Sequence, residues 1–587
     1  MPTTPRTPSP GQAAVLKNEA GARIRLVKAA PGSGKTWLVG ELIRGKLEAW
    51  AGRGGIAALS FTRVARDAIA DALGGMLPPH PHFVGTLDSF VYRYVFRVFG
   101  PAIKDWLGPL RLLPASVADH QGDWATKGLT VAIGNRRVRL FDIHVRRIEG
   151  DKPQLLYKTN NMGRAEPVPK GAQRAVWKQK EWLWRTARVA SHSDIAYLSW
   201  RIATHATHGK TIRRLLADRF PLVVLDEVQD TGWFLADTVH ALLGEETTRG
   251  VIVGDRDQAI YEFGGAQPGD LDRFDSLEGA VHFPMRESFR CPTKVCQIAT
   301  ALSWQKATVT PSGSREGHAI LYVYEQQPDI EQLCSTVEKD VGASPTTVLA
   351  RGKSGMSKLV SMSPTAPKFG SRPLQHLWSA CNHLRAGRAK EALGGTQAAI
   401  SRVLFATEGW RSSDLLDVGL DEDAWRALAA STLCVAVSLP CEDSLFDWCA
   451  LALNTLKDQL GDLTTRPNVS KRLRSGGKKL KEAPASDYMA TTRDGPSRRC
   501  TTVHGAKGET HEVTMLFVPK TSRPRCPGTT WFSEAPEHGE ERRIAFVAAS
   551  RPREAFVLCI HKTTYERLQT SASSFLAEFD VRHLTIT

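Results

Sequence analysis

A glycine-rich segment near the N-terminus has the residue types that bind a nucleoside triphosphate. Its sequence, AAPGSGKT, ends at Thr36 and follows a short apolar stretch that predicts a β-strand. Glycines at positions 32 and 34 let backbone N–H groups close on phosphate oxygens, and a helix beginning here adds partial positive charge. Lys35 is placed to reach the β- and γ-phosphates, and the Thr36 hydroxyl to ligate Mg²⁺. The predicted ATP-binding residues of this segment are Ala30, Pro31, Gly32, Ser33, Gly34, Lys35 and Thr36.

Two adjacent acids at the end of another apolar run have the types needed to activate water. The segment FPLVVLDEVQDT at 220–231 predicts a buried strand that ends at Asp226 and Glu227. Asp226 is placed to hold Mg²⁺ through water, and Glu227 to deprotonate the water that attacks the γ-phosphate. A further strand and loop at 251–266 place Gln258 where it can sense the γ-phosphate. Gln12, just upstream of the glycine-rich loop, has the position of a glutamine that reads the adenine edge.

Aromatic and polar residues at other predicted strand ends suit contact with single-stranded nucleic acid. Ligands of an open parallel sheet bind at the carboxyl ends of its strands, and a ring there can stack on a base. Taken alone, a ring at such a position is also explained as part of the core. The candidate contacts found in this way are Phe61, Thr62, Arg63, Thr86, Tyr261 and Phe263.

Residues from about 96 to 199 interrupt this alternation of strands and helices. The stretch 129–148 predicts a hairpin with a Gly-Asn turn. The stretch 172–189 predicts a basic helix whose tryptophans either stack on bases or belong to the core. We interpret the region as an inserted accessory domain.

Composition favours a globular protein with a polyanionic partner. The 587 residues contain 77 Lys and Arg against 61 Asp and Glu, a net charge of +16, and nucleic acid is the first candidate. A diffusely basic surface is the simpler alternative. Ten cysteines without CxxC spacing indicate a reducing cytoplasm, and no apolar run approaches the roughly 18 residues of a membrane span. The Pro/Thr-rich N-terminus lacks the features of a secretory signal.

Taken in order, these motifs resemble those of the UvrD/Rep (PcrA-like) family of superfamily 1 helicases. DEVQD is similar to the family's DExxQ box, and VGDRDQAIYEFGGA to its next motif. Later segments also resemble family motifs, namely FPMRESFRCP at 283–292, TTVHGAKGETHEV at 501–513 and EERRIAFVAASRPRE at 540–554.

The resemblance implies roles for residues of these later motifs. Arg290 and Arg551 correspond to arginine fingers, and Phe289 to the residue that stacks on adenine. Glu509 corresponds to a residue at the ribose. DNA contact is implied for Thr502 and His504. The catalytic set that results is Lys35, Glu227, Gln258, Arg290 and Arg551.

The resemblance also implies an α/β fold with two RecA-like P-loop NTPase lobes, each a parallel sheet flanked by helices with a mainly helical insertion. Lobe 1A is expected over 1–95 and 200–275, and insertion 1B over 96–199. Lobe 2A is expected over 276–365 and 496–587. Insertion 2B, expected over 366–495, ends in a strongly basic stretch that suits phosphate contact or a solvated loop.

The expected function is that of an ATP- and Mg²⁺-dependent DNA helicase or translocase. The resemblance implies 3′→5′ movement on single-stranded DNA and separation of tailed duplex DNA, in repair, recombination or replication. One alternative is a DNA-stimulated ATPase that is the motor or sensor subunit of a larger complex, for example in phage defence beside a separate nuclease. A non-hydrolysing nucleic-acid-binding regulator and an RNA motor are further alternatives. A partner nuclease or repair protein stays open, and no membrane partner is expected.

Overall fold

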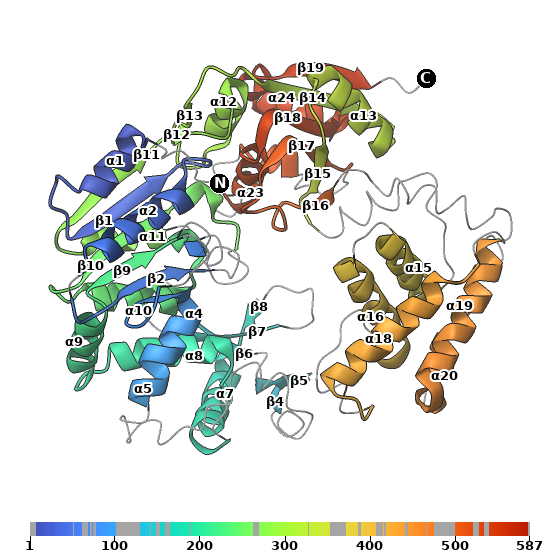
Figure 1. The fold of residues 1–587 in the computed structure, drawn as a ribbon, viewed down its shortest axis with the longest axis horizontal. Coiled ribbons are helices and arrows are strands. Elements are labelled where there is room, and N and C mark those ends of the chain that lie inside the picture. The colour runs from blue at the N-terminus through green and yellow to red at the C-terminus, as the bar shows by residue number, and fades with distance from the viewer. Residues whose placement is uncertain are drawn as a thin grey trace.

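The computed structural model has two α/β lobes and two insertions (Figure 1). It describes residues 7–50, 52–61, 69–70, 73, 78–100, 130–134, 136–140, 143–147, 153–158, 165–187, 190–261, 269–326, 328–352, 371–385, 389–406, 415, 418–440, 444–466, 468–474, 499–520, 527–532 and 539–584. None of the helices within these ranges is long and apolar enough to cross a membrane.

The first lobe is built on a parallel sheet of six strands in the order β11-β1-β10-β9-β2-β3. The strands are β1 (Ile24–Ala29), β2 (Ile56–Ser60), β3 (Phe83–Thr86), β9 (Leu222–Leu225), β10 (Arg249–Gly254) and β11 (Ala280–Met285). The four central strands are almost continuously buried because helices cover both faces of the sheet.

Successive side chains along a strand point to opposite faces of the sheet, and each face has its own apolar core. Leu26 packs with α8 (His192–Ala203), α9 (Gly209–Arg219) and α10 (Trp233–Leu243), whereas Val27 packs on the opposite face. That opposite face is covered by α1 (Pro10–Lys17) and α2 (Lys35–Glu48). Short elements complete the lobe, namely α4 (Leu87–Phe90), η1 (Val91–Phe96), α5 (Arg97–Phe99), η5 (Val228–Asp230), η6 (Arg256–Gln258), α11 (Asp270–Arg273) and η8 (Phe274–Ser276).

The first lobe extends further along the chain than we expected. Its predicted end at residue 275 falls before β11, yet β11 pairs with β1 along its whole length, from Ala280 beside Ile24 to Met285 beside Ala29. The sequence AVHFPM lacks a strong strand pattern because only two of its six residues are buried, at the edge of the sheet. Pairing with β1 therefore decides its structure.

The second lobe repeats the architecture, which confirms the prediction of two RecA-like lobes. Six parallel strands lie in the order β16-β15-β17-β18-β14-β19. The strands are β14 (His318–Tyr324), β15 (Thr346–Ala350), β16 (Cys500–Thr502), β17 (His511–Val518), β18 (Pro552–His561) and β19 (Asp580–Leu584). The longer helices are α12 (Thr293–Leu302), α13 (Ile330–Val341), α23 (Gly539–Ala549) and α24 (Lys562–Ser571). Shorter elements are β12 (Glu287–Ser288), β13 (Thr310–Pro311), α22 (Pro527–Thr530) and α25 (Ser573–Leu576).

The insertion of the first lobe combines short strands with helices, so it has more strand than the mainly helical insertion we expected. The predicted hairpin is present, with β4 (Thr130–Ile133) antiparallel to β5 (Arg136–Arg139). A second antiparallel sheet contains β6 (Ile143–Arg147), β7 (Pro153–Lys158) and β8 (Ala165–Pro167). The predicted basic helix is α7 (Lys170–Trp182) followed by η4 (Leu183–Ala187). Trp177 and Trp184 pack with Tyr197 of α8, ring centroids 5.8 and 5.9 Å away, so these two tryptophans serve the core.

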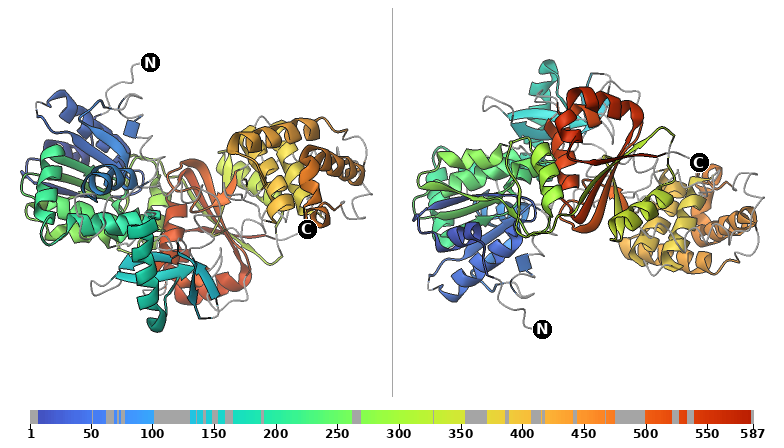
Figure 2. Two further views of the ribbon diagram at one scale, coloured as in Figure 1. Left: turned by 90° about the horizontal axis from the view of Figure 1, so that it is seen from below. Right: turned by 90° about the horizontal axis from the view of Figure 1, so that it is seen from above.

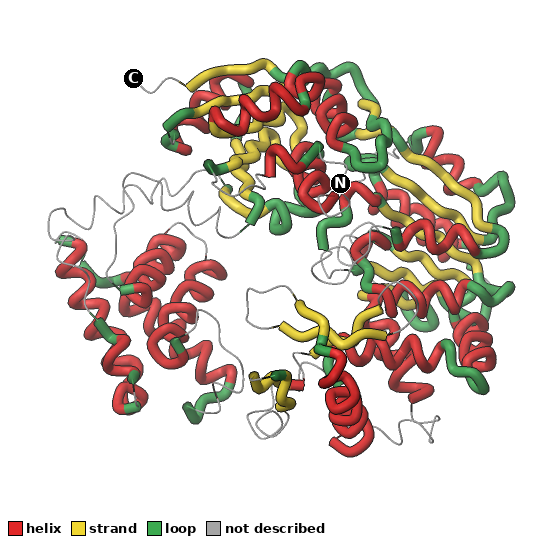
Figure 3. The backbone as a smooth tube through the Cα atoms, turned by 180° about the vertical axis from the view of Figure 1, so that it is seen from behind, coloured by secondary structure: helices red, strands yellow, loops and turns green. Residues whose placement is uncertain are grey.

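The insertion of the second lobe is a helical bundle that stands apart from both sheets (Figures 1 and 2). Its elements are α15 (Arg372–Arg385), α16 (Ala389–Phe405), α18 (Glu422–Val437), α19 (Leu445–Leu460), η9 (Gly461–Thr465) and α20 (Val469–Arg472). Figure 3 shows it from behind as an all-helical unit. The bundle has its own core, in which Trp378 and Trp448 meet edge to face at 4.7 Å. Most of the predicted basic stretch lies outside the described residues.

A fully buried ion pair joins the first insertion to α8, which begins within the range predicted for that insertion but packs on the sheet of the first lobe. Lys180 of α7 donates to both carboxylate oxygens of Asp194 at 2.9 and 3.1 Å, and both side chains are inaccessible to solvent. Asp194 also accepts from the backbone N–H of Ser191 at 2.9 Å, which fixes the start of α8.

We predict that Lys180→Met lowers the free energy of unfolding by about 3–5 kcal/mol, because it leaves the Asp194 carboxylate buried without a counter-charge. Urea titration followed by tryptophan fluorescence measures the change. Adding Asp194→Asn should restore part of the loss. Lys562→Met, which breaks the exposed pair with Glu325, is the matched control and should leave unfolding unchanged.

Candidate active site

The glycine-rich loop joins β1 to α2 in the conformation that the sequence predicts. Gly32 and Gly34 have φ values of 72° and 78°, which L-residues rarely adopt, and α2 begins at Lys35. Lys35 is buried and Thr36 is half-buried. A neighbouring strand also positions the loop, because the Ala30 N–H donates to the Met285 carbonyl of β11 at 2.8 Å. The Gly32 carbonyl accepts from the Phe289 N–H at 2.9 Å, so the predicted adenine-stacking residue lies against the loop.

Gln12 contacts the loop directly. Its Nε2 donates to the Ser33 carbonyl at 2.8 Å, while its Oε1 accepts from the Ser9 N–H at 3.0 Å in the capping box of α1. The side chain is fully buried. Its contacts therefore position the loop, and adenine recognition by Gln12 stays a prediction.

The two predicted acids follow β9, beside the loop. Asp226 N–H donates to the Leu59 carbonyl at 2.9 Å, and its Oδ1 accepts from the Glu227 N–H at 2.9 Å. Burial, reinforced by the Glu227 charge, raises the pKa of Asp226 to about 7. Although burial alone acts in the opposite direction, the charges of Lys35 and Lys507 lower the pKa of Glu227. Asp226 is thus a buried acid whose charged form is disfavoured, and Glu227 is a carboxylate at neutral pH.

Gln229 fixes the Glu227 carboxylate, a role that the sequence analysis missed. Its Nε2 donates to Glu227, and its Oε1 accepts from the Asp255 N–H at 3.0 Å after β10. A Cβ at Gly254 would lie 2.8 Å from the same Oε1, so the amide fits closely against β10. The glutamine of DEVQD was visible in the sequence, but spacing alone did not show which groups it joins.

The two predicted arginine fingers lie in the second lobe and face the same cleft. Arg551 donates through Nη2 to Gln258 Oε1 at 2.9 Å, and Arg290 donates to the Ser550 carbonyl at 3.1 Å. Burial, with the nearby Arg290 charge, lowers the pKa of Arg551 to about 9, and burial also lowers the pKa of Arg290. The charge of Glu227 acts in the opposite direction and raises the pKa of both arginines.

A buried ion pair between the lobes was not anticipated. Lys507, in the loop before β17, donates to Asp230 Oδ1 and Oδ2 at 2.6 and 2.5 Å and to the Gln258 carbonyl at 2.7 Å. Both side chains are less than a tenth exposed. The Lys507 ammonium also lies 4.9 Å from the ring centroid of Tyr261. Lys507 is the lysine of the VHGAKG segment, so the sequence showed the residue itself. Its acidic partner lies 277 residues away, so the sequence did not show the ion pair.

Three of the predicted DNA-contact residues come together next to this ion pair. The Phe61 and Tyr261 rings are 6.0 Å apart, and the Tyr261 and His504 rings 5.9 Å. The Tyr261 hydroxyl donates to the His504 carbonyl at 3.4 Å, and His504 Nε2 lies 3.0 Å from the Ile260 carbonyl. We name Phe61, Tyr261 and His504 the aromatic cluster. It contains residues of both lobes.

The other predicted contact residues are placed differently or fall outside the described chain. Thr86 caps α4, accepting from the Ser89 N–H at 3.3 Å. Thr502 accepts from the Gly505 N–H at 3.1 Å and so shapes the loop that carries His504. Thr62, Arg63 and Phe263 lie outside the described residues.

Glu509, expected at the ribose, has two partners of its own. Its carboxylate accepts from Arg499 at 2.5 Å and lies 3.2 Å from His511 Nε2. Its backbone carbonyl faces Arg551 Nη1 at 3.4 Å. The side chain would have to leave these partners to contact a ribose, so its expected role stays a prediction.

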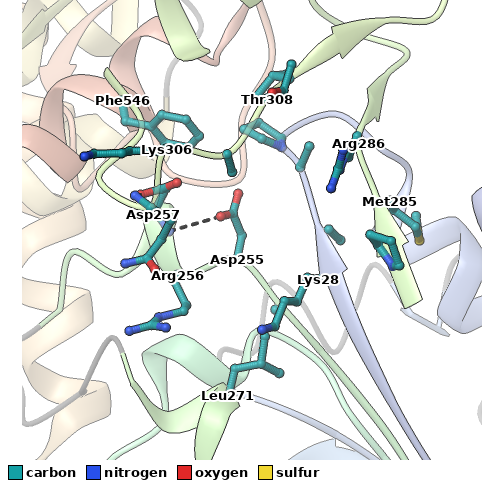
Figure 4. A pocket seen from close by; sticks show the side chains of 18 residues that line it. Lys28, Asp255, Arg256, Asp257, Leu271, Met285, Arg286, Lys306, Thr308 and Phe546 are labelled. Atoms are coloured by element: carbon teal, nitrogen blue, oxygen red, sulfur yellow. Dashed lines mark hydrogen bonds between the residues drawn. The ribbon is translucent and has the colours of Figure 1, made fainter. Parts of the chain in front are cut away.

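A cavity of about 370 Å³ opens between the lobes at the start of the glycine-rich loop (Figure 4). Its walls come from the ends of β1, β10 and β11 and from residues 305–309 of the second lobe. Lys28, Asp255, Asp257, Arg286 and Lys306 surround it. Lys35, Asp226 and Glu227 do not line it, so this space adjoins the predicted phosphate site and is not that site.

The residues present fit a nucleoside triphosphate with Mg²⁺. The Ser33 hydroxyl in the loop is buried and has no hydrogen-bond partner among the described residues, so it is available to a phosphate. Lys35, Arg290 and Arg551 bring positive charge from both lobes, and the buried Asp226 carboxyl, whose pKa is raised to about 7, is of the type that ligates Mg²⁺. This site on two parallel-sheet lobes defines the class of RecA-like P-loop NTPases.

Comparison with known proteins supports the family resemblance over the N-terminal part of the chain. Residues 10–277 match the family model of the UvrD/REP helicase N-terminal domain, which confirms the resemblance to the UvrD/Rep family. Proteins named DNA helicase II from Salmonella typhimurium (strain LT2) and Escherichia coli (strain K12) are each 28% identical over 167 residues. The matched region covers 28% of this chain and 22% of each of those proteins, so the likeness spans less than a quarter of the relatives' length.

We predict that Gly32→Ala weakens ATP binding by at least about tenfold. A Cβ there would lie 2.6 Å from Ser288 Oγ and 2.7 Å from Arg290 Cβ, and its φ would cost about 1–2 kcal/mol for an L-residue. The loop must then move away from Arg290. Fluorescent-nucleotide titration measures the affinity. Gly45→Ala, whose Cβ would meet no neighbour in α2, is the control and should bind ATP normally.

Proposed function

We propose that the chain is an ATP-dependent DNA helicase or translocase that moves 3′→5′ on single-stranded DNA. The observation that carries the proposal is the meeting of predicted hydrolytic residues of one lobe with arginines of the other, next to the aromatic cluster. The names of the relatives and the net charge of +16 favour DNA as the polymer.

In this proposal the hydrolytic step uses residues of both lobes. Lys35 and the loop N–H groups hold the phosphates, while Thr36 and Asp226 would hold Mg²⁺, which supplies charge neutralisation at the phosphates. Glu227 accepts the proton of the attacking water, since its pKa is lowered and Gln229 fixes its carboxylate. Arg290 and Arg551 stabilise the charge that develops on the transferred phosphoryl group.

Coupling between hydrolysis and movement would pass through the contacts that cross the cleft. Gln258 contacts Arg551 through its side chain and Lys507 through its carbonyl. Tyr261, three residues further on, touches the other two members of the aromatic cluster. A change at the γ-phosphate that moves Gln258 would therefore shift rings that stack on bases. Alternate tightening of the two lobes on single-stranded DNA would then give stepping.

We predict that Glu227→Gln lowers kcat for ATP hydrolysis by at least about 10²-fold while ATP binding persists, because the amide cannot accept the proton. Steady-state phosphate release and nucleotide titration measure the two properties. Glu48→Gln, the same change at the exposed end of α2, is the control. Near-normal turnover in Glu227→Gln would remove this residue from the mechanism.

We predict that Phe61→Leu raises the concentration of single-stranded DNA needed for half-maximal ATPase stimulation by about five- to a hundredfold. The range corresponds to the roughly 1–3 kcal/mol of one base–aromatic stack. Phe61→Trp keeps a stacking face and should retain most of the affinity. Equal losses in both variants would mean that Phe61 supports the fold and does not stack on a base.

Strand displacement on 3′-tailed and 5′-tailed duplexes tests direction and autonomy. Displacement from the 3′ tail alone is the expected result. ATPase stimulation by DNA without displacement from either tail would instead favour the motor subunit of a larger complex. Stronger stimulation by RNA than by DNA of the same sequence would favour an RNA motor.

A further inference from the structure

A second basic site lies in the helical bundle, far along the chain from the nucleotide loop. A hollow of about 500 Å³ lies between the start of α15, the end of α16 and the short helix α20. The cationic side chains that line it are Arg372, Arg402, Lys471, Arg472 and Arg474. We name this hollow the basic pocket. The lining residues that the structure describes include no carboxylate.

The floor of the basic pocket is rigid because it belongs to the core of the bundle. Leu374, Val403 and Val469 are buried in one apolar cluster beneath the helix ends. Asn468 starts α20 with φ 67°, a left-handed conformation that asparagine tolerates. Val469 of α20 faces this core, whereas Lys471, two residues further along, is exposed at the rim of the pocket. The charges are therefore presented by a packed scaffold.

Three of the five cations have a structural explanation. Arg472 donates to the Val403 and Leu404 carbonyls at 3.2 and 2.9 Å, and Arg402 donates to the Ala406 carbonyl at 3.2 Å. Both satisfy carbonyl groups at the end of α16, where a helix dipole favours positive charge.

Arg474 Nε donates to the Lys471 carbonyl near the end of α20 at 2.7 Å. The other two cations, Arg372 and Lys471, have no such bond within the described residues. Arg372 is the first residue of α15, where the helix dipole is already positive and a cation is unfavourable. Lys471 and Arg474 add their charges beside it, and within the described residues none of these three side chains forms an ion pair with a carboxylate. Such a cluster costs stability unless an anion binds it.

A buried hydroxyl points to the same ligand. Ser371, which precedes α15 and lines the basic pocket, is 5% exposed, and its Oγ has no hydrogen-bond partner within the part of the chain that the structure describes. A buried hydroxyl without a partner costs free energy, and a phosphate oxygen at the helix start would satisfy it together with the first backbone N–H groups.

We propose that the basic pocket binds a phosphate group of a multiply charged ligand, separately from the ATP site. The phosphate belongs either to a free polyphosphate or nucleotide, or to a nucleic acid. The site does not depend on ATP hydrolysis, so its test is independent of the proposed function.

Calorimetric titration of the full chain with tripolyphosphate tests the free ligand. A Lys35→Ala background weakens phosphate binding at the glycine-rich loop, so that the remaining binding reports the second site. Adding Lys471→Glu and Arg474→Glu should weaken that binding at least tenfold, and adding Ser371→Ala should weaken it by less. The control pair Arg426→Glu and Lys457→Glu changes the net charge of the bundle equally on exposed surfaces of α18 and α19 and should change binding less than twofold.

Fluorescence anisotropy with a short blunt duplex, with and without 5′-phosphates, tests nucleic acid as the source. The phosphate would be assigned to nucleic acid by two results together. The Lys471→Glu/Arg474→Glu variant would lose duplex binding, and the chain without these two changes would not bind tripolyphosphate at the basic pocket. If neither ligand distinguishes that variant from the control pair, the proposal is wrong. Circular dichroism of each variant checks that the helices are retained.

Discussion

Buried charge shared across the cleft between the lobes is the constraint on which the site depends. Asp230 and Lys507 form an ion pair that is almost fully removed from water, and Arg551 is buried against Gln258. Charges in such an environment are stable only with a partner, so neither lobe can withdraw without exposing or orphaning a charge. A movement of one lobe therefore changes the electrostatic environment of the charged side chains in the other.

The same constraint explains why Glu227, the predicted catalytic base, is a carboxylate while the neighbouring Asp226 is not fully ionised. Lys35 comes from one lobe and Lys507 from the other, and both lower the pKa of Glu227. Asp226, deeper and next to that negative charge, has its pKa raised to about 7. Two adjacent acids thus acquire different properties from their surroundings, one suited to accept a proton and the other to accept a cation.

The two insertions use different means to stay folded. The first is joined to its lobe by a common apolar core and by the buried Lys180–Asp194 pair. The second is a bundle with its own tryptophan-containing core, and its surface carries the basic pocket. A unit that folds around its own core can present charge at its helix ends without disturbing the RecA-like lobes.

The sequence by itself determined the elements whose signals are local. Strands such as β14 and β15 and the glycine-rich loop were predictable because continuous apolar runs and left-handed glycines are fixed by neighbouring residues. Tertiary structure decided the rest. β11 is a strand because β1 lies beside it, and Gln229 and Lys507 acquire roles from partners that the fold brings close. The partner of Lys507 lies 277 residues away, and no local pattern records such a distance.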